Sequence, residues 1–171
     1  RRQAVPLTKR AWAFLENGAE LAIRDFETAK ELSPENPDTL IGLAYAYAKN
    51  GLWREAIREV QTALPLAQAQ AKEVGPPAFA LFHNSASVYA SCITAVADDE
   101  LLTNELKSAL AAKLSLAAVE QLGEAFTVAE PDPNIRQIML RVMKSDAALK
   151  PIRSFPAYQK LAERLSAGVE Q

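Results

Sequence analysis

The sequence predicts an all-α fold made of antiparallel helix pairs that repeat along the chain. Of the 171 residues, 49% are apolar, only 6 are glycine, and one pattern of small and large apolar residues occurs twice at an offset of 33 to 34 residues. A large apolar fraction permits a buried core, and few glycines suit helices, which glycine destabilises. A repeat of this length is typical of stacked helical units.

The predicted second helices of the first two units are residues 20–32 and 54–66, at an offset of 34. Phe26 and Val60 are both large and apolar. The identical pairs are Ala22/Ala56, Ile23/Ile57, Arg24/Arg58, Thr28/Thr62, Ala29/Ala63 and Leu32/Leu66. Because alanine lets helix backbones approach closely, these matched positions predict helices packed against one another.

The predicted first helices align residues 6–18 with 39–51, at an offset of 33. Each ends in an Asn-Gly pair, which favours the left-handed conformation that closes a helix. Between the units, Asn36 can cap a helix that has Pro37 at its first position. The matched pairs are Leu7/Leu40, Ala11/Ala44, Trp12/Tyr45, Ala13/Ala46, Phe14/Tyr47, Asn17/Asn50 and Gly18/Gly51.

A third unit is present in stretched form. Its matches to the earlier units are Phe82, Ala86, Tyr89, Ala118, Leu122 and Ala125. Tyr89 and Ala118 are 29 residues apart, whereas Tyr47 and Ala56 are 9 apart. The insertion, around residues 98–116, has a helical pattern and should lengthen the helix pair.

The last part of the chain should close the stack. Pro131-Asp132-Pro133 breaks the chain, and residues 134–144 and 158–166 read as amphipathic helices joined by a turn at 146–152. We therefore expect one domain over residues 1–171. Its parts are repeat one at about 5–34, repeat two at about 37–70, repeat three at about 77–130 and capping helices at about 133–168.

These residues resemble the tetratricopeptide repeat family. The resemblance covers residues 5 to about 70 well and 79–126 loosely. Repeat two departs at its end, where Pro65 comes early and Gln68 takes the place of the closing proline. The matching residues are Leu7, Ala11, Phe14, Gly18, Ala22, Phe26, Ala29 and Pro34 in repeat one, and Leu40, Ala44, Tyr47, Gly51, Ala56, Val60 and Ala63 in repeat two. The family implies a right-handed superhelix of antiparallel helix pairs.

A narrower resemblance covers the second half. Residues 81–91 (LFHNSASVYAS), 116–126 and 145–161 look like the tail of bacterial repeat proteins that is often attached to Hanks-type serine/threonine kinases. This resemblance implies a regulatory or docking appendage. The chain itself has no Gly-rich phosphate loop, catalytic-loop His-Arg-Asp or Asp-Phe-Gly.

The charge composition bears on the class of partner. With 19 basic and 21 acidic residues the net charge is −2, and the sequence has no excess of basic residues that would indicate nucleic-acid binding. Residues 78–97 carry no charge, but scattered polar residues favour a buried helix over membrane insertion. The single cysteine, Cys92, excludes an internal disulfide and leaves the compartment open, with the cytoplasm favoured. A start at Arg1 without methionine suggests a fragment of a longer protein.

The sequence offers little chemistry. His83 and Cys92 are the only histidine and cysteine, and their separation on one predicted helix makes them face different ways. They form neither a nucleophile pair nor a complete metal site, so we expect no enzyme, cofactor or metal. The acidic run 98–100 is predicted to be a solvated helix start; the alternative is a cation or partner patch.

The predicted function is protein–protein interaction, because the resemblance implies that the first helices line a concave groove. Aromatic residues on these helices either anchor a bound partner or pack between the helices, and the sequence leaves both interpretations open. Two alternatives are the kinase appendage and self-association through the first repeat. The predicted groove residues are Thr8, Lys9, Trp12, Ile41, Tyr45, Lys49, His83, Asn84 and Ser87.

Overall fold

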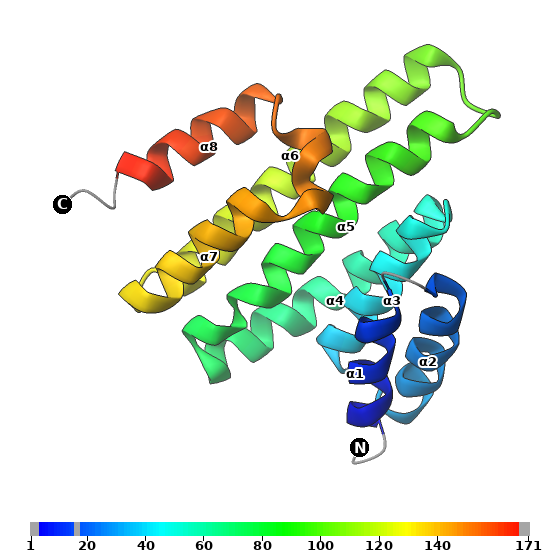
Figure 1. Cartoon of the computed structure of the whole chain (residues 1–171), viewed down its shortest axis with the longest axis horizontal. Coiled ribbons are helices and arrows are strands. Elements are labelled where there is room, and N and C mark those ends of the chain that lie inside the picture. Colours follow the sequence, from blue (N-terminus) through cyan, green and yellow to red (C-terminus); the bar gives the residue numbers. More distant parts are fainter. Residues whose placement is uncertain (1–3, 16–17, 168–171) are drawn as a thin grey trace.

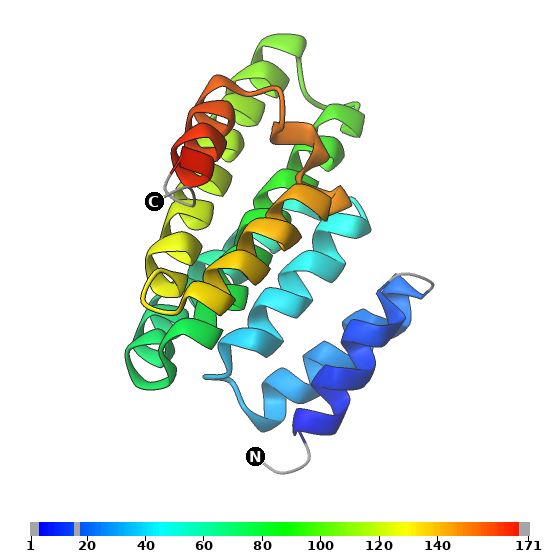
Figure 2. The same ribbon diagram turned by 60° about the vertical axis from the view of Figure 1, so that its left-hand side comes forward.

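The computed structural model describes residues 4–15 and 18–167. Throughout these ranges the regular elements are all helical, which confirms the all-α prediction. In chain order they are α1 (Ala4–Phe14), α2 (Ala19–Leu32), α3 (Pro37–Lys49), α4 (Trp53–Val74), the 3-10 helix η1 (Pro76–Ala78), α5 (Phe79–Asp98), α6 (Asn104–Ala129), α7 (Pro133–Ser145), the 3-10 helix η2 (Ala147–Ile152) and α8 (Pro156–Ala167). Antiparallel pairs α1/α2, α3/α4 and α5/α6 stack in chain order (Figures 1 and 2).

The predicted caps of α3 are present. The side chain of Asn36 accepts hydrogen bonds from the backbone N–H groups of Asp38 and Thr39, with Pro37 at the first helical position. Gly51 follows α3 with a φ of 79°, the left-handed geometry expected at a helix end. The equivalent Asn17 lies outside the described residues. Gly18 has an extended φ of −164° and precedes α2, so the left-handed prediction does not hold there.

Helix α4 is longer than the second repeat predicts, because it continues through Pro65 to Val74. Pro65 is exposed, so the backbone carbonyl that loses its helical partner lies on the side where water can satisfy it.

The third pair is the longest, and the predicted lengthening by the insertion is confirmed. Its α5–α6 end extends past the neighbouring pair (Figure 1). Thr103 caps α6 by accepting a hydrogen bond from the N–H of Leu106. The acidic run 98–100 was expected to start a helix, and that prediction is wrong. Asp98 is the last residue of α5 and Asp99 is its C-cap, because the insertion extends α5 as well as α6.

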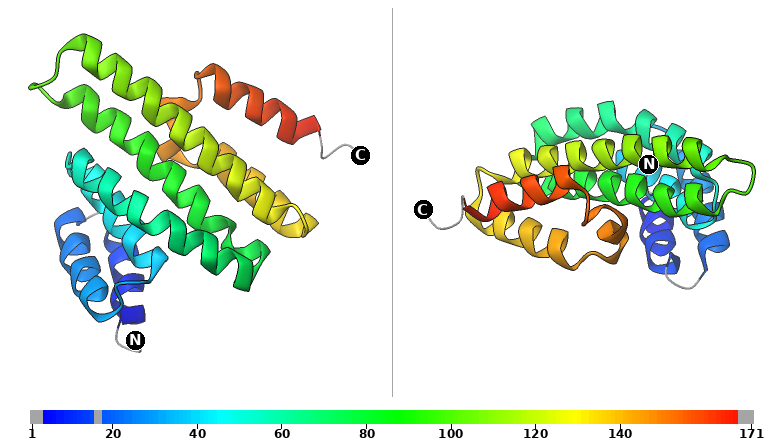
Figure 3. Two further views of the ribbon diagram at one scale, coloured as in Figure 1. Left: turned by 180° about the vertical axis from the view of Figure 1, so that it is seen from behind. Right: turned by 90° about the horizontal axis from the view of Figure 1, so that it is seen from above.

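The C-terminal segment folds back over the third pair. Asp132 caps α7, which begins at Pro133 and packs on α6 and α5. Instead of a plain turn, the chain then forms η2, which lies along α5. Helix α8 returns beside α6 (Figure 3).

The core forms two clusters. One joins α1 and α2 to α3 around Phe26, and the other fills the rest of the stack. Tyr45 and Tyr47 contact both clusters and so connect the first pair to the others. The repeated alanines Ala22, Ala29, Ala56 and Ala63 are all 0% exposed, as close helix packing requires. Among the described helices, none has the length and apolarity needed to cross a membrane.

Candidate functional site: a groove along the first helices

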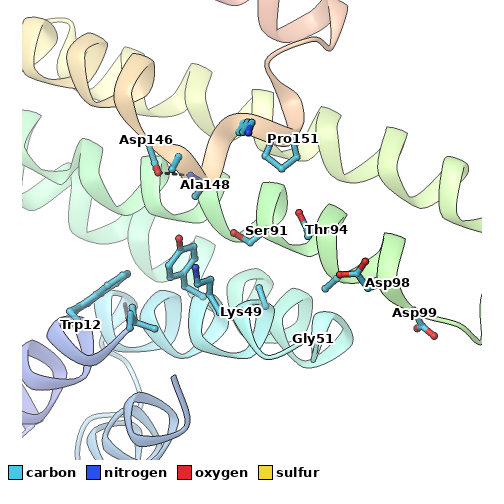
Figure 4. A pocket seen from close by; sticks show the side chains of 16 residues that line it. Trp12, Lys49, Gly51, Ser91, Thr94, Asp98, Asp99, Asp146, Ala148 and Pro151 are labelled. Atoms are coloured by element: carbon cyan, nitrogen blue, oxygen red, sulfur yellow. Dashed lines mark hydrogen bonds between the residues drawn. The ribbon is translucent and has the colours of Figure 1, made fainter. Parts of the chain in front are cut away.

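A groove of about 1320 Å³ runs along the face shared by the first helices of the three pairs (Figure 4). Helices α1, α3 and α5 form its floor and one side, and η2 forms the opposite wall. Its lining consists of Trp12, Leu15, Tyr45, Ala48, Lys49, Gly51, Ser91, Thr94, Ala95, Asp98, Asp99, Asp146, Ala147, Ala148, Lys150 and Pro151.

One end of the groove is aromatic. The Trp12 ring stacks on Tyr45, with centroids 6.3 Å apart and 29° between planes. Its other contact is an edge-to-face pair with Phe26 at 5.6 Å. The indole Nε1–H of Trp12 donates to Oδ1 of Asp38 at 3.2 Å. Burial raises the pKa of the Asp38 carboxyl, and the Trp12 hydrogen bond opposes that rise. With its N–H occupied and two neighbours around it, the indole is held in place and presents carbon surface to the groove.

A smaller hollow of about 140 Å³ opens beside this aromatic end, between Trp12, Tyr45, Asn84, Ser87 and Asp146. This is roughly the space of one aromatic ring. Asn84 is half-buried, and its amide makes no hydrogen bond to any described residue.

The wall η2 is fixed to α5 by the carboxylate of Asp146. Oδ2 of Asp146 lies 2.9 Å from Nε2 of His83 and accepts a hydrogen bond from the Ser87 hydroxyl at 2.7 Å. Oδ1 accepts from the Ala148 N–H at 2.8 Å and so caps η2 (Figure 4). Burial raises the pKa of Asp146, but the bonds from His83, Ser87 and Ala148 outweigh it and bring the pKa to about 2.

Further contacts keep η2 in place. Leu149 and Ile152 are both 0% exposed and anchor η2 in the core. The Arg153 guanidinium donates to the backbone carbonyls of Lys144 and Asp146 at 2.9 and 2.8 Å. The wall therefore does not depend on one interaction.

The other end of the groove is polar. Asp99 accepts from the Trp53 indole at 3.0 Å, and Arg54 forms an ion pair with it at 3.2 Å. These bonds, together with the Leu101 N–H, hold the pKa of Asp99 below its usual range, with the Trp53 bond contributing most. The Arg54 guanidinium also lies 4.0 Å from the centre of the Trp53 ring. Asp99 thus connects the α5–α6 turn to the start of α4.

The serine and cysteine beside the groove are engaged in packing and hydrogen bonds within the described residues. Ser87 donates to Oδ2 of Asp146 and to the His83 carbonyl, and Oδ2 is shared with Nε2 of His83, so these bonds serve to hold η2 on α5. Cys92 is buried, lies 3.9 Å from the Trp53 carbonyl, and its pKa rises to about 12 because of burial. In the described ranges, no three His, Cys, Asp or Glu side chains gather where they would hold a metal ion.

The nine predicted groove residues divide into three sets. The structure places Trp12, Tyr45 and Lys49 along the groove, and Asn84 and Ser87 at the smaller hollow. Lys9 is exposed and lies outside both linings. Thr8, Ile41 and His83 are buried and lie outside both linings, so their prediction as groove contacts is wrong and they are packing residues. The Thr8 hydroxyl pairs with that of Thr39 at 2.8 Å, Ile41 joins the main core, and His83 holds Asp146.

Sequence reasoning missed the rest of α5 and all of η2. Ser91, Thr94 and Asp98 follow Ser87 at intervals of three and four residues, the spacing of one helix face. This signal was available once a long helix was expected. Nothing in the local pattern placed η2 opposite α3.

The folded chain is a helical-repeat protein of stacked helix pairs with a groove along its first helices. A family model described as tetratricopeptide repeat matches residues 13–74, from α1 to the end of α4. The matched part supports the family resemblance and a general role in protein–protein interaction, which is typical of non-catalytic repeat modules. Comparison with curated proteins and with solved structures found no match to the chain.

Proposed function

We propose that this chain is a protein-interaction module that binds a segment of another protein in the groove between α1–α3 and η2. The observation that carries the proposal is the groove itself. It has about 1320 Å³ of space, with the stacked rings of Trp12 and Tyr45 at one end. Aromatic side chains that bury much area at small entropic cost are common anchors of protein interfaces.

The walls support the proposal because they are held in position before a partner arrives. The Trp12 ring is fixed by Asp38, Phe26 and Tyr45, and η2 is fixed by Asp146, Leu149 and Ile152. A preformed site loses less conformational entropy on binding than a site that must order itself.

Calorimetry with peptides selected from a random peptide library on the full chain tests the proposal. Tyr45→Ala should weaken a selected peptide about thirtyfold, since a buried aromatic anchor contributes about 2 kcal/mol. Gln61→Ala, at an exposed position of α4, is the matched control and should leave affinity unchanged. Glu59 on the same helix is a poorer control, because it forms an ion pair with Lys30 at 2.6 Å that its substitution would remove.

Circular dichroism and the melting temperature of each variant separate lost binding from lost folding. Equal affinities of folded Tyr45→Ala and Gln61→Ala would place the partner on the convex face or at the chain ends, against the proposal.

The kinase appendage and self-association stay predictions. The first rests on the resemblance of the second half, and a kinase domain encoded in the same gene would support it. The second is tested by the dependence of elution volume on concentration in gel filtration.

A further inference from the structure

We propose that the groove selects an acidic segment with one apolar anchor: the anchor enters the hollow beside Trp12, and carboxylates of the segment pair with Lys49 and Lys150. This inference rests on the proposed function, because it names the chemistry of the segment that the groove takes.

The first step is the hydrogen bonding of the carboxylates in the groove. Three carboxylates line it, and the oxygens of two of them already accept hydrogen bonds within the protein. Asp99 is bonded by Trp53, Arg54 and the Leu101 N–H. Asp146 is bonded by His83, Ser87 and the Ala148 N–H. Both carboxylates are thus held by the protein itself, and Asp99 also has the Arg54 cation.

The second step is the two lysines. Lys49 is the last residue of α3, and Lys150 lies on η2, so they approach the groove from opposite walls. Both are exposed, and neither ammonium bonds to a described residue. By contrast, Lys30 is paired with Glu59 and Lys107 donates to the Ala97 carbonyl. The groove therefore presents two positive charges that its own residues leave unpaired.

The third step is the order of these features along the groove. Figure 4 shows Trp12 at one end, Lys49 further along, and Asp98 and Asp99 at the far end. Asp98 is exposed and makes no bond to a described residue. A complementary segment then has an apolar side chain first, carboxylates next, and a neutral or basic residue beside Asp98.

A nucleic acid is the other anionic occupant to consider. Binding through phosphates usually depends on several cationic contacts, whereas this groove offers two beside a free carboxylate, on a chain of net charge −2. The small hollow for an apolar side chain also favours a polypeptide. A polypeptide segment with an apolar side chain beside Trp12, carboxylates beside the two lysines and a neutral or basic residue beside Asp98 is thus the occupant that fits.

Selection of a random peptide library on the full chain, in parallel with the double variant Lys49→Glu/Lys150→Glu, tests this inference. Peptides selected by the unmodified chain should carry an apolar or aromatic residue followed by Asp or Glu. The double variant should instead enrich Lys and Arg. The matched control is Lys113→Glu/Lys160→Glu, which changes the net charge equally at exposed positions outside the groove.

Fluorescence anisotropy with a labelled selected peptide gives the size of the effect. Each groove lysine that is reversed should weaken the peptide about tenfold, and the control pair should change its affinity less than about twofold. Replacing the peptide's carboxylates by amides should produce the same loss. Raising NaCl to about 1 M, where the Debye length is about 3 Å, should weaken the unmodified pair in the same direction.

Different results would contradict the acidic segment and the groove itself. Peptides that depend on Tyr45 but carry no acidic preference, with equal affinity for the groove and control double variants, would overturn the acidic segment and leave the groove as the site. Peptides that ignore Tyr45 and both groove lysines would overturn both proposals. A single-stranded oligonucleotide that competes with the peptide at the same site would overturn the choice of a polypeptide.

Discussion

The ring of Phe26 on α2 packs directly against the backbone of Gly42 on α3. A Cβ atom placed on Gly42 would overlap two ring carbons of Phe26. Phe26 is 0% exposed, so its ring cannot swing outward without opening the junction between the first two helix pairs. Residue 42 must therefore be glycine for this junction to close as it does.

Gly42→Ala should destabilise the chain despite the better helix propensity of alanine. Overpacking typically costs about 1–3 kcal/mol, and the propensity gain of up to about 1 kcal/mol offsets only part of it. Urea unfolding should show a net loss of about 1–2 kcal/mol. Gly123→Ala on α6 is the matched control, because nothing lies within 4 Å of its added Cβ. That variant should be stabilised, and a stabilised Gly42→Ala would contradict the close packing of Phe26.

Ala56→Arg should unfold the chain or destabilise it severely. Ala56 is 0% exposed on α4 and belongs to the main core cluster, so a guanidinium buried there would have no partner. The expected cost is about 3 kcal/mol or more. Thermal unfolding followed by circular dichroism measures it, with Gln61→Arg at an exposed position of the same helix as the control. Melting temperatures within a few degrees of each other would show that the packing is assigned wrongly.

Acid should weaken the hold of Asp146 on α5. The pKa of this carboxyl falls from an ordinary 3.8 to about 2 in the folded chain. A lowered folded-state pKa contributes stability above about pH 4 that is lost as the pH falls toward about 2. We therefore expect the unmodified chain to lose more unfolding free energy than Asp146→Asn over that interval. Asp99 and Glu105, whose pKa values are also lowered, are present in both proteins and cancel in the comparison.

Urea unfolding of the two proteins from about pH 6 to about pH 2 makes this comparison. Above about pH 4, Asp146→Asn should be the less stable protein, because His83 and Ser87 then lose a charged acceptor. Parallel pH profiles would show that Asp146 contributes no such linkage.

The repeat could be read from local patterns. Alanines at matched places, the Asn36-Pro37 start of α3 and the Gly51 end are signals within a few residues of the feature they specify. Helix periodicity and capping depend on neighbours in sequence, so these elements form where the pattern puts them. The same logic predicted the lengthened third pair. It placed a helix start at the acidic run 98–100, whereas α5 ends at Asp98 and the N-cap of α6 is Thr103.

The groove could be predicted only in part. Matching the first helices placed Trp12, Tyr45 and Lys49 on one face, which the alignment of units alone made visible. Which of the neighbouring residues face the groove could be decided only from the packed structure. Ile41, one turn before Tyr45, belongs to the buried core. With 3.6 residues per turn, residues four apart differ in direction by only about 40°, and sequence spacing does not resolve which of the two faces the groove.

By itself, the sequence determined the helix pairs, most of their ends and the face that they share, because those features depend on residues close together in the chain. Only the tertiary structure decided what stands opposite that face. Asp146 bonds to His83, which is 63 residues away in the sequence, and Asp99 bonds to Trp53, which is 46 residues away. Such long-range contacts depend on the length and direction of every helix in between. The wall η2, and with it Lys150, reaches the groove because α5, α6 and α7 together bring the chain back to it.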